Sequence, residues 1–315
     1  MDRDAWPWDG LPLVALPHEV AGVPDPVAET KQRGRRVGTQ AGVEAAMLKA
    51  MRAEEPKFVR VLVNRWRSSG ESITVAEVAA AVEAGDLTAA RWATLQQELA
   101  ETVAGPIGDR WTAMAERSRA YWSSVLVARG KPALAWDRIK ARIERWISTS
   151  GANLLRQVTE TQRAAVRVII TEFGVRRAAG AAPTARALRG VLGLTDRQAT
   201  AAVRYADGLT AAGVTGPKAD AAVARYQLRL ERHRATVVAR TETANAWMAG
   251  NQATIREAII RGDISPATRA VWVTMDDERV CPECGPLHET VTRQVPPLHP
   301  QCRCNVLWEE PPSPA

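Results

Sequence analysis

Residues 281–304 read CPECGPLHETVTRQVPPLHPQCRC and contain all four cysteines of the 315-residue chain. Two of the four histidines, His288 and His299, lie in the same window. Sulfur and imidazole gathered in so short a stretch are typical of a metal site or of a crosslinked segment. We therefore expect the C-terminal end of the chain to fold around this cluster.

The spacing of the ligand-type residues forms two short pairs, Cys281-x2-Cys284 and His299-x2-Cys302. Two such pairs, each in a tight turn, predict a tetrahedral structural zinc site. If the chain is extended from Cys302 onward, the sulfur of Cys304 points to the same side and can replace His299, giving a four-cysteine site. The sequence leaves the fourth ligand open between His299 and Cys304. Because protein side chains can fill all four positions, a catalytic zinc is not expected.

Crosslinking is the rival chemistry for the same cysteines. One or two disulfides would be disfavoured in a reducing cytosol and permitted in an extracellular particle. Free thiols are the third alternative.

A longer pattern surrounds the cluster. The order W-x3-D-x2-R-V-C-P-x-C precedes P-P-L-H-P-x-C-R-C, and an upstream A-R-T-E segment occupies 239–242. In combination these motifs resemble the phage Mu F-like minor head proteins, also called phage head morphogenesis proteins, over residues 185–304. The resemblance implies structural roles for six motif residues, and it implies none for His288, which similar members often lack. The six are Arg240, Glu242, Asn245, Trp272, Asp276 and Arg279.

The resemblance also implies a function. Members of this family are structural proteins of tailed-phage heads, present in few copies, that associate with the portal during assembly and influence DNA packaging or ejection. The expected partners are the portal protein, packaged DNA and other capsid proteins. The expected location is the head interior or portal region of the virion, after assembly in the host cytoplasm.

Composition agrees with a globular protein that has an anionic partner. Apolar residues make up 46% of the chain and charged residues 24%, which is ordinary for a folded domain. The net charge of +7 favours DNA or an acidic protein surface as partner. No stretch approaches the roughly 20 apolar residues of a membrane span, and the first residues lack the features of a signal peptide, so no membrane is expected.

Hydrophobic periodicity predicts a mainly α fold, with elongated helical N-terminal and central regions and a small C-terminal α+β module clasped by the Cys/His cluster. Five segments are expected: an extended Pro- and Trp-rich arm at 1–26, a helical domain at 27–180, the helical part of the Mu F-like domain at 181–262, the α+β module at 263–310 and a loose tail at 311–315. Within them we expect helices at 43–67, 73–84, 109–129, 152–177, 217–250 and 251–261, further helices capped by Thr88 and Thr195 and one through Trp136 and Trp146, and strands at 269–274 and 306–308. Pro56 is expected to break or kink the first helix.

The helix expected at 217–250 carries an arginine stripe. At about 100° per residue, Arg225, Arg229, Arg232 and Arg240 fall on one arc of that helix. Guanidinium groups in this arrangement can bind phosphate or an acidic partner. The alternatives are a solvated face and, for Arg240 with Glu242, an internal network of the family motif.

Catalysis is the competing class of function. A maturation protease or an ADP-ribosyltransferase-type toxin fused to a Mu F-like domain would need a recognisable set of catalytic residues. Outside the cluster the only histidines are His18 and His233, and the triplet Ser148-Thr149-Ser150 is not followed by a suitable Glu-x-Glu. We therefore expect no enzyme. A free DNA-binding zinc protein is the remaining alternative.

Overall fold

The structure is a computed structural model that describes residues 34–178, 180–275 and 280–311. The described residues are mainly helical, with a small region of short strands near the C-terminus, which confirms the predicted mainly α class. The predicted arm at 1–26, the motif residues Asp276 and Arg279, and all of the predicted tail except residue 311 lie outside the described residues.

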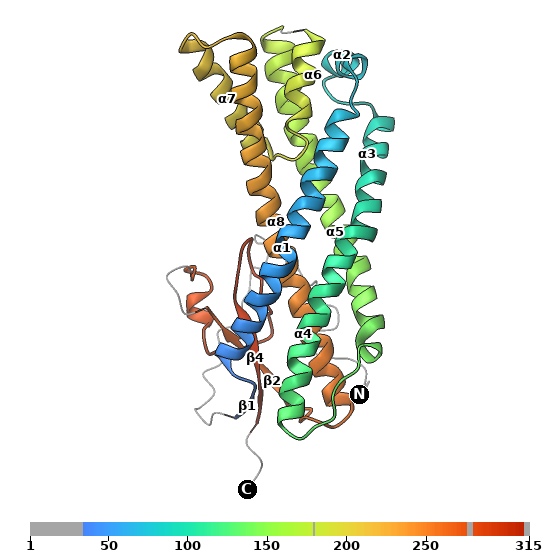
Figure 1. The fold of residues 1–315 in the computed structure, drawn as a ribbon, viewed down its shortest axis with the longest axis vertical. Helices are drawn as coiled ribbons and strands as arrows, with labels where there is room; N and C mark the ends of the chain where they lie inside the picture. The colour runs from blue at the N-terminus through green and yellow to red at the C-terminus, as the bar shows by residue number, and fades with distance from the viewer. Residues whose placement is uncertain (1–33, 179, 276–279, 312–315) are drawn as a thin grey trace. The chain divides into compact units, whose positions relative to one another are not determined.

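The helices follow one another through most of the chain (Figure 1). The α-helices are α1 (Gln40–Glu71), α2 (Val75–Ala84), α3 (Ala89–Thr102), α4 (Gly108–Ala128), α5 (Asp137–Ile169), α6 (Ala181–Arg189), α7 (Asp196–Ala211) and α8 (Gly216–Ile260). Two π-helical segments, η1 (Val103–Ile107) and η2 (Ile170–Arg176), follow α3 and α5 directly, and η3 (Gly285–Leu287) is a single 3-10 turn. None of the helices in the described ranges combines the length and apolar composition needed to cross a bilayer.

Helix starts are set by local capping, as the sequence predicts. The hydroxyl of Thr195 accepts the Gln198 N–H at 3.3 Å, and the Gln198 side chain accepts the Thr195 N–H at 3.1 Å, forming a complete capping box at the start of α7. The hydroxyl of Thr88 caps α3 by accepting the Arg91 N–H. These contacts satisfy backbone donors that the first helical turn leaves unpaired.

The long helices continue where breaks were predicted. Helix α1 runs without interruption through Pro56, which is exposed, whereas Met51 and Phe58 on either side of it are buried. The predicted break there is wrong, because packing of the flanking residues outweighs the local cost of proline. The two helices predicted around residue 150 are the single helix α5, and those predicted on either side of residue 250 are the single helix α8.

Four strands form one antiparallel sheet in the order β1-β4-β2-β3. They are β1 (Arg35–Val37), β2 (Arg269–Val273), β3 (Val291–Thr292) and β4 (Asn305–Glu310). Strands β2 and β4 confirm the predicted strands, whereas the short strands β1 and β3 were not predicted. Strand β1 comes from the N-terminal part of the chain, and its Val37 lies opposite Trp308 of β4. The C-terminal module is therefore completed by N-terminal residues (Figure 1).

Contacts divide the chain into two compact units, each made of separated segments. Unit 1 contains the described residues up to 55, residues 110–147 and those from 240 onward; unit 2 contains 56–109 and the described part of 148–239. Helices α1, α5 and α8 contribute to both units. The domain boundaries drawn from the sequence stay a prediction.

Large aromatic rings fill the core of unit 1. Five tryptophans there are fully buried, and Trp111 of α4 meets Trp146 of α5 edge to face at 5.6 Å between ring centres. The indole N–H of Trp308 donates to the Asn251 side chain at 2.6 Å, tying β4 to α8. The five are Trp111, Trp122, Trp247, Trp272 and Trp308.

A buried arginine organises the core of unit 2. Arg234 of α8 donates to the Leu194 carbonyl at 2.6 Å and to the Thr161 hydroxyl, and its guanidinium lies 5.3 Å from the ring centre of Trp66. Burial lowers the pKa of Arg234 to about 10. This arginine therefore belongs to the interior of unit 2 rather than to the exposed stripe of α8.

Candidate metal centre

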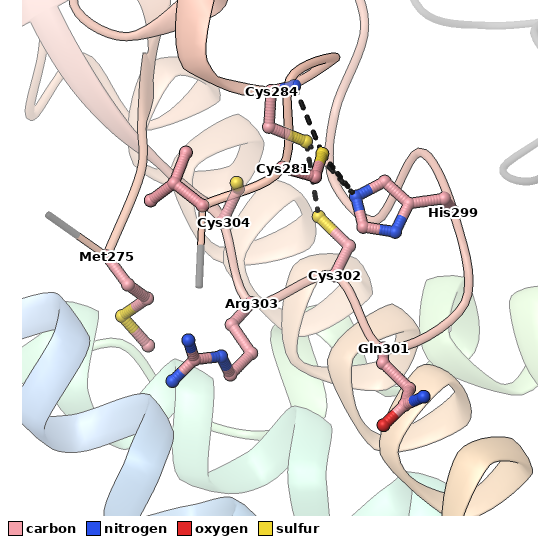
Figure 2. Close-up of a pocket in the computed structure, with 9 residues that line it drawn as sticks. Met275, Cys281, Cys284, His299, Gln301, Cys302, Arg303 and Cys304 are labelled. Atoms are coloured by element: carbon pink, nitrogen blue, oxygen red, sulfur yellow. Dashed lines mark hydrogen bonds between the residues drawn. The ribbon is translucent and has the colours of Figure 1, made fainter. Parts of the chain in front are cut away.

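Two loops bring the five predicted ligands together in unit 1. The first loop lies between β2 and β3 and includes residues 280–290. The second loop, residues 293–304, connects β3 to β4. Figure 2 shows the side chains of Cys281, Cys284, His299 and Cys302 converging, with Cys304 beside them. All four cysteines are free in this structure.

The distances define two overlapping groups. His299 Nε2 lies 3.0 Å from Cys281 Sγ and 3.3 Å from Cys284 Sγ, and Cys284 Sγ lies 3.9 Å from Cys302 Sγ. The ligand atoms of Cys281, Cys284 and His299 lie within 4.8 Å of one another, as do those of Cys284, Cys302 and Cys304. Cys284 is common to both groups, so both candidates for the fourth position are at the cluster.

Each ligand pair sits in a hydrogen-bonded turn. In the first, the Cys284 N–H points at Cys281 Sγ at 3.3 Å, and the 3-10 turn η3 begins at the next residue. In the second, the Cys302 N–H donates to the His299 carbonyl at 3.1 Å. The Nδ1 of His299 lies 2.9 Å from the Pro300 carbonyl. A proton on Nδ1 is satisfied there, which leaves the Nε2 lone pair facing the sulfurs.

The sulfur pKa values diverge within the cluster. Burial raises the pKa of Cys284, and the hydrogen bond with Cys302 together with burial raises that of Cys304. The Cys304 thiol, which donates to Cys302, is the main cause that lowers the pKa of Cys302 to about 6. Burial opposes ionisation of Cys281, but hydrogen bonds from Cys284 and from the Glu283 amide, together with the charge of His299, lower the pKa of Cys281. The lowered pKa values of Cys281 and Cys302 make the thiolate form that metals bind easier to reach at these two sulfurs.

The residues fit a tetrahedral metal ion. Two sulfurs bound at about 2.3 Å in a tetrahedron lie about 3.8 Å apart, close to the 3.9 Å between Cys284 and Cys302. The distances from His299 Nε2 to the two sulfurs are somewhat shorter than the about 3.6 Å of the same geometry. A pocket of about 30 Å³ lies among the five side chains. This donor set can hold a metal ion.

A tryptophan packs against the cluster and His288 stands outside it. Trp272 of β2 is fully buried against Cys284, Cys302 and Cys304. The Nδ1 of His288 accepts the Thr274 N–H at 3.1 Å, which gives this histidine a structural partner.

Two residues of the A-R-T-E segment on α8, Arg240 and Thr241, contact Gln301 in the second ligand turn. Arg240 forms an ion pair with Glu55 of α1 at 3.5 Å and donates to the Gln301 side chain at 3.2 Å. The Thr241 hydroxyl accepts the Gln301 N–H at 3.1 Å. Sequence reasoning did not find Gln301 or Glu55, and it gave Thr241 no role although that residue is part of the quoted A-R-T-E segment.

Glu242 and Asn245 form the next contact along α8. The Asn245 amide donates to the Glu242 carboxylate at 3.5 Å. Burial raises the pKa of Glu242 to about 7, against which hydrogen bonds from Asn245 and Trp111 act to lower it.

The four arginines of the predicted stripe do not share one environment. Arg225, Arg229 and Arg232 are exposed on the part of α8 in unit 2, and the charge of Arg232 acts on the neighbouring carboxylate of Glu231. The guanidinium of Arg229 lies 5.0 Å from the ring centre of Tyr226. Arg240 belongs to unit 1 and is held by Glu55 and Gln301. The geometry thus separates three exposed arginines from Arg240, which is half-buried and contacts Glu55 and Gln301.

Comparison with known proteins gives one match. The family model described as Phage Mu protein F like protein matches residues 204–307, a range that includes α8, β2, β3 and all five candidate ligands. No curated protein and no solved structure matches the chain. The resemblance drawn from the motifs is thereby confirmed.

Proposed function

Because residues 204–307 are a phage Mu F-like domain, we propose that the chain is a structural minor head protein of a tailed phage, which associates with the portal during capsid assembly. In this proposal it resides in the head interior or portal region of the virion, and it influences DNA packaging or ejection. The observation that carries the proposal is that the matched domain contains a cluster of candidate metal ligands, all of them side chains of this protein.

The proposed metal is zinc, and its proposed role is to hold the C-terminal module together. From the Cys281 turn to β4, regular structure amounts to one 3-10 turn and the two-residue strand β3. Such a segment buries too little apolar surface to be stable by packing alone, and metal ligation supplies the missing stabilisation. Disulfides between the same cysteines are the alternative way to supply it.

The proposed role is not catalytic. Four or five protein ligands compete for the four positions of a tetrahedral ion, and a catalytic zinc keeps one position for water or substrate. The Ser148-Thr149-Ser150 triplet lies inside helix α5, and His233 is exposed on α8.

The three exposed arginines of α8 are the proposed contact face for an anionic partner. Exposed guanidinium groups can bind phosphate oxygens or acidic side chains. The face is formed by Arg225, Arg229 and Arg232. If the partner is DNA, each lost phosphate contact should reduce the slope of log affinity against log salt by about 0.9.

The experiment is a pull-down of the full-length chain with its cognate portal protein. Three variants run beside it: a deletion of residues 1–26, the triple substitution Arg225→Gln, Arg229→Gln, Arg232→Gln, and Arg176→Gln as a control for an exposed arginine already paired with Glu172. We expect the full-length chain and the control to retain the portal. A full-length chain that ignores the portal would contradict the assembly role. Salt-dependent DNA binding without any portal would instead support the free DNA-binding alternative.

A further inference from the structure

Gln301 lies between two candidate ligands, and helix α8 holds it at two points. Its N–H donates to the Thr241 hydroxyl at 3.1 Å, and its side-chain oxygen accepts from Arg240 at 3.2 Å. Both partners are on the same turn of α8, sixty residues earlier in the chain. The second ligand turn is thus fixed through backbone and side chain by one pair of residues.

Arg240 is itself fixed from a second helix. Its Nε lies 3.5 Å from the carboxylate of Glu55 on α1, whose side chain is only 17% exposed. Burial raises the pKa of Glu55, and the charge of Arg240 partly offsets this. Arg240 therefore contacts both α1 and the second ligand turn.

The held turn has an unfavourable backbone. Gln301 has a φ of 65°, in the left-handed region that side chains other than glycine rarely occupy. Within the turn the Cys302 N–H donates to the His299 carbonyl. Such a conformation persists only where surrounding contacts over-determine it. Without α8, His299 and Cys302 would lose the arrangement that brings Nε2 and Sγ to the cluster.

We infer that Arg240 and Thr241 are positioning residues of the metal site, which hold the Gln301 turn in its ligand-presenting conformation and thereby set how tightly the metal is bound. The inference rests on the proposed metal site and adds two residues that touch no metal. Outer contacts that orient ligands typically change metal affinity by 10- to 100-fold when they are removed. The Arg-Thr pair of the A-R-T-E segment then has a chemical role, namely to couple the metal cluster to α8 and α1.

The test compares zinc affinity among variants of the full-length chain by competition with a chromophoric chelator. Thr241→Ala removes the acceptor for the Gln301 N–H, and Arg240→Gln and Gln301→Ala remove the side-chain contact. We expect each to weaken zinc binding, with Thr241→Ala in the 10- to 100-fold range. Thr241→Ser keeps a hydroxyl and should restore affinity. Thr236→Ala is the control, because that threonine is also on α8 and its hydroxyl donates to the Arg232 carbonyl within the same helix.

A second readout separates positioning from general stability. Cobalt(II) substituted into the site reports ligand geometry through its visible absorption, so Thr241→Ala should change that spectrum and Thr236→Ala should not. If Thr241→Ala does not fold, Gln301→Ala and Arg240→Gln decide: weaker zinc binding supports the inference and unchanged binding overturns it.

The outcomes distinguish this inference from the proposal beneath it. A wild-type chain that binds zinc, with Thr241→Ala and Arg240→Gln binding equally well, overturns the positioning role and leaves the metal site standing. A wild-type chain that binds no zinc under reducing conditions removes both.

Discussion

Glu242 is a carboxylate inside the motif region of α8, held by the Asn245 amide and the Trp111 side chain. Burial is the main cause that raises its pKa from 4.5 to about 7. The folded chain therefore binds this proton more tightly than the unfolded chain does. The stability that follows is fully present below about pH 4.5 and is lost as the pH rises through about 7.

We expect Glu242→Gln, which carries no charge at any pH, to be more stable than the wild type at about pH 8 by on the order of 1–3 kcal/mol. At about pH 4 the two proteins should unfold at similar temperatures, because the wild-type carboxyl is then protonated in both states. Thermal unfolding at the two pH values measures the difference. Glu116→Gln, at an exposed position of α4, is the control. A stability difference that does not grow with pH would contradict the buried-carboxyl account.

The cluster of candidate metal ligands was predictable from the sequence, whereas its surroundings were not. Residue type and spacing, which are local properties, identify Cys281, Cys284, His299, Cys302 and Cys304 in the sequence. The contact between Thr241 and Gln301 joins residues sixty positions apart, and Glu55 reaches Arg240 from another helix. Only tertiary packing creates such pairs. The same packing gives Arg240 its contacts with Glu55 and Gln301. Helical periodicity grouped Arg240 with Arg225, Arg229 and Arg232 and could not show this difference.

Gly250 shows why the end predicted for the long helix was wrong. A Cβ at this position would lie 2.4 Å from the Ala115 carbonyl oxygen of α4, so the glycine permits the close approach of two helices. In the sequence the same residue resembles a helix stop. Helix starts were better predicted, because Thr88 and Thr195 act on backbone groups only three residues away. The strands β1 and β3 were missed because three and two residues are too short to show alternation.

We expect Gly250→Ala to destabilise unit 1 by about 1–3 kcal/mol, because α4 and α8 must move apart to admit the methyl group. The matched substitution Gly208→Ala lies inside α7 with nothing within 4 Å of the new Cβ. It should stabilise the chain by about 0.5–1 kcal/mol through helix propensity. Chemical denaturation of both variants measures the two effects. Equal effects of the two substitutions would contradict the close packing of α4 against α8.

The C-terminal module depends on residues far away in the sequence. Strand β1 pairs with β4, and Arg36 of β1 forms an ion pair with Glu289 at 2.7 Å. Trp247 and Trp308 are buried in a unit that also contains α4 and the first part of α1. The sequence predicted a small α+β Cys/His module at 263–310 without residues 35–37, because nothing local indicates that they pair with its sheet.

We expect a fragment of residues 204–315 to lack cooperative unfolding, because it retains the matched domain but loses β1, α1 and α4. Circular dichroism with thermal denaturation, in the presence of zinc, compares it with the full-length chain. Adding back residues 34–128 as a separate chain should restore part of the structure. A fragment that melts cooperatively by itself would show that the module is independent of the N-terminal residues.

The proposed role of the Cys/His cluster is to bind a metal ion that holds the C-terminal module together. Its most direct test is elemental analysis of the purified, reduced full-length chain, beside Cys281→Ser and Cys302→Ser. We expect about one zinc ion per wild-type chain. We expect both variants to lose the zinc and to become sensitive to proteases in the C-terminal region. A wild-type chain with less than about half an equivalent of zinc, or variants that keep the metal and the fold, would contradict it.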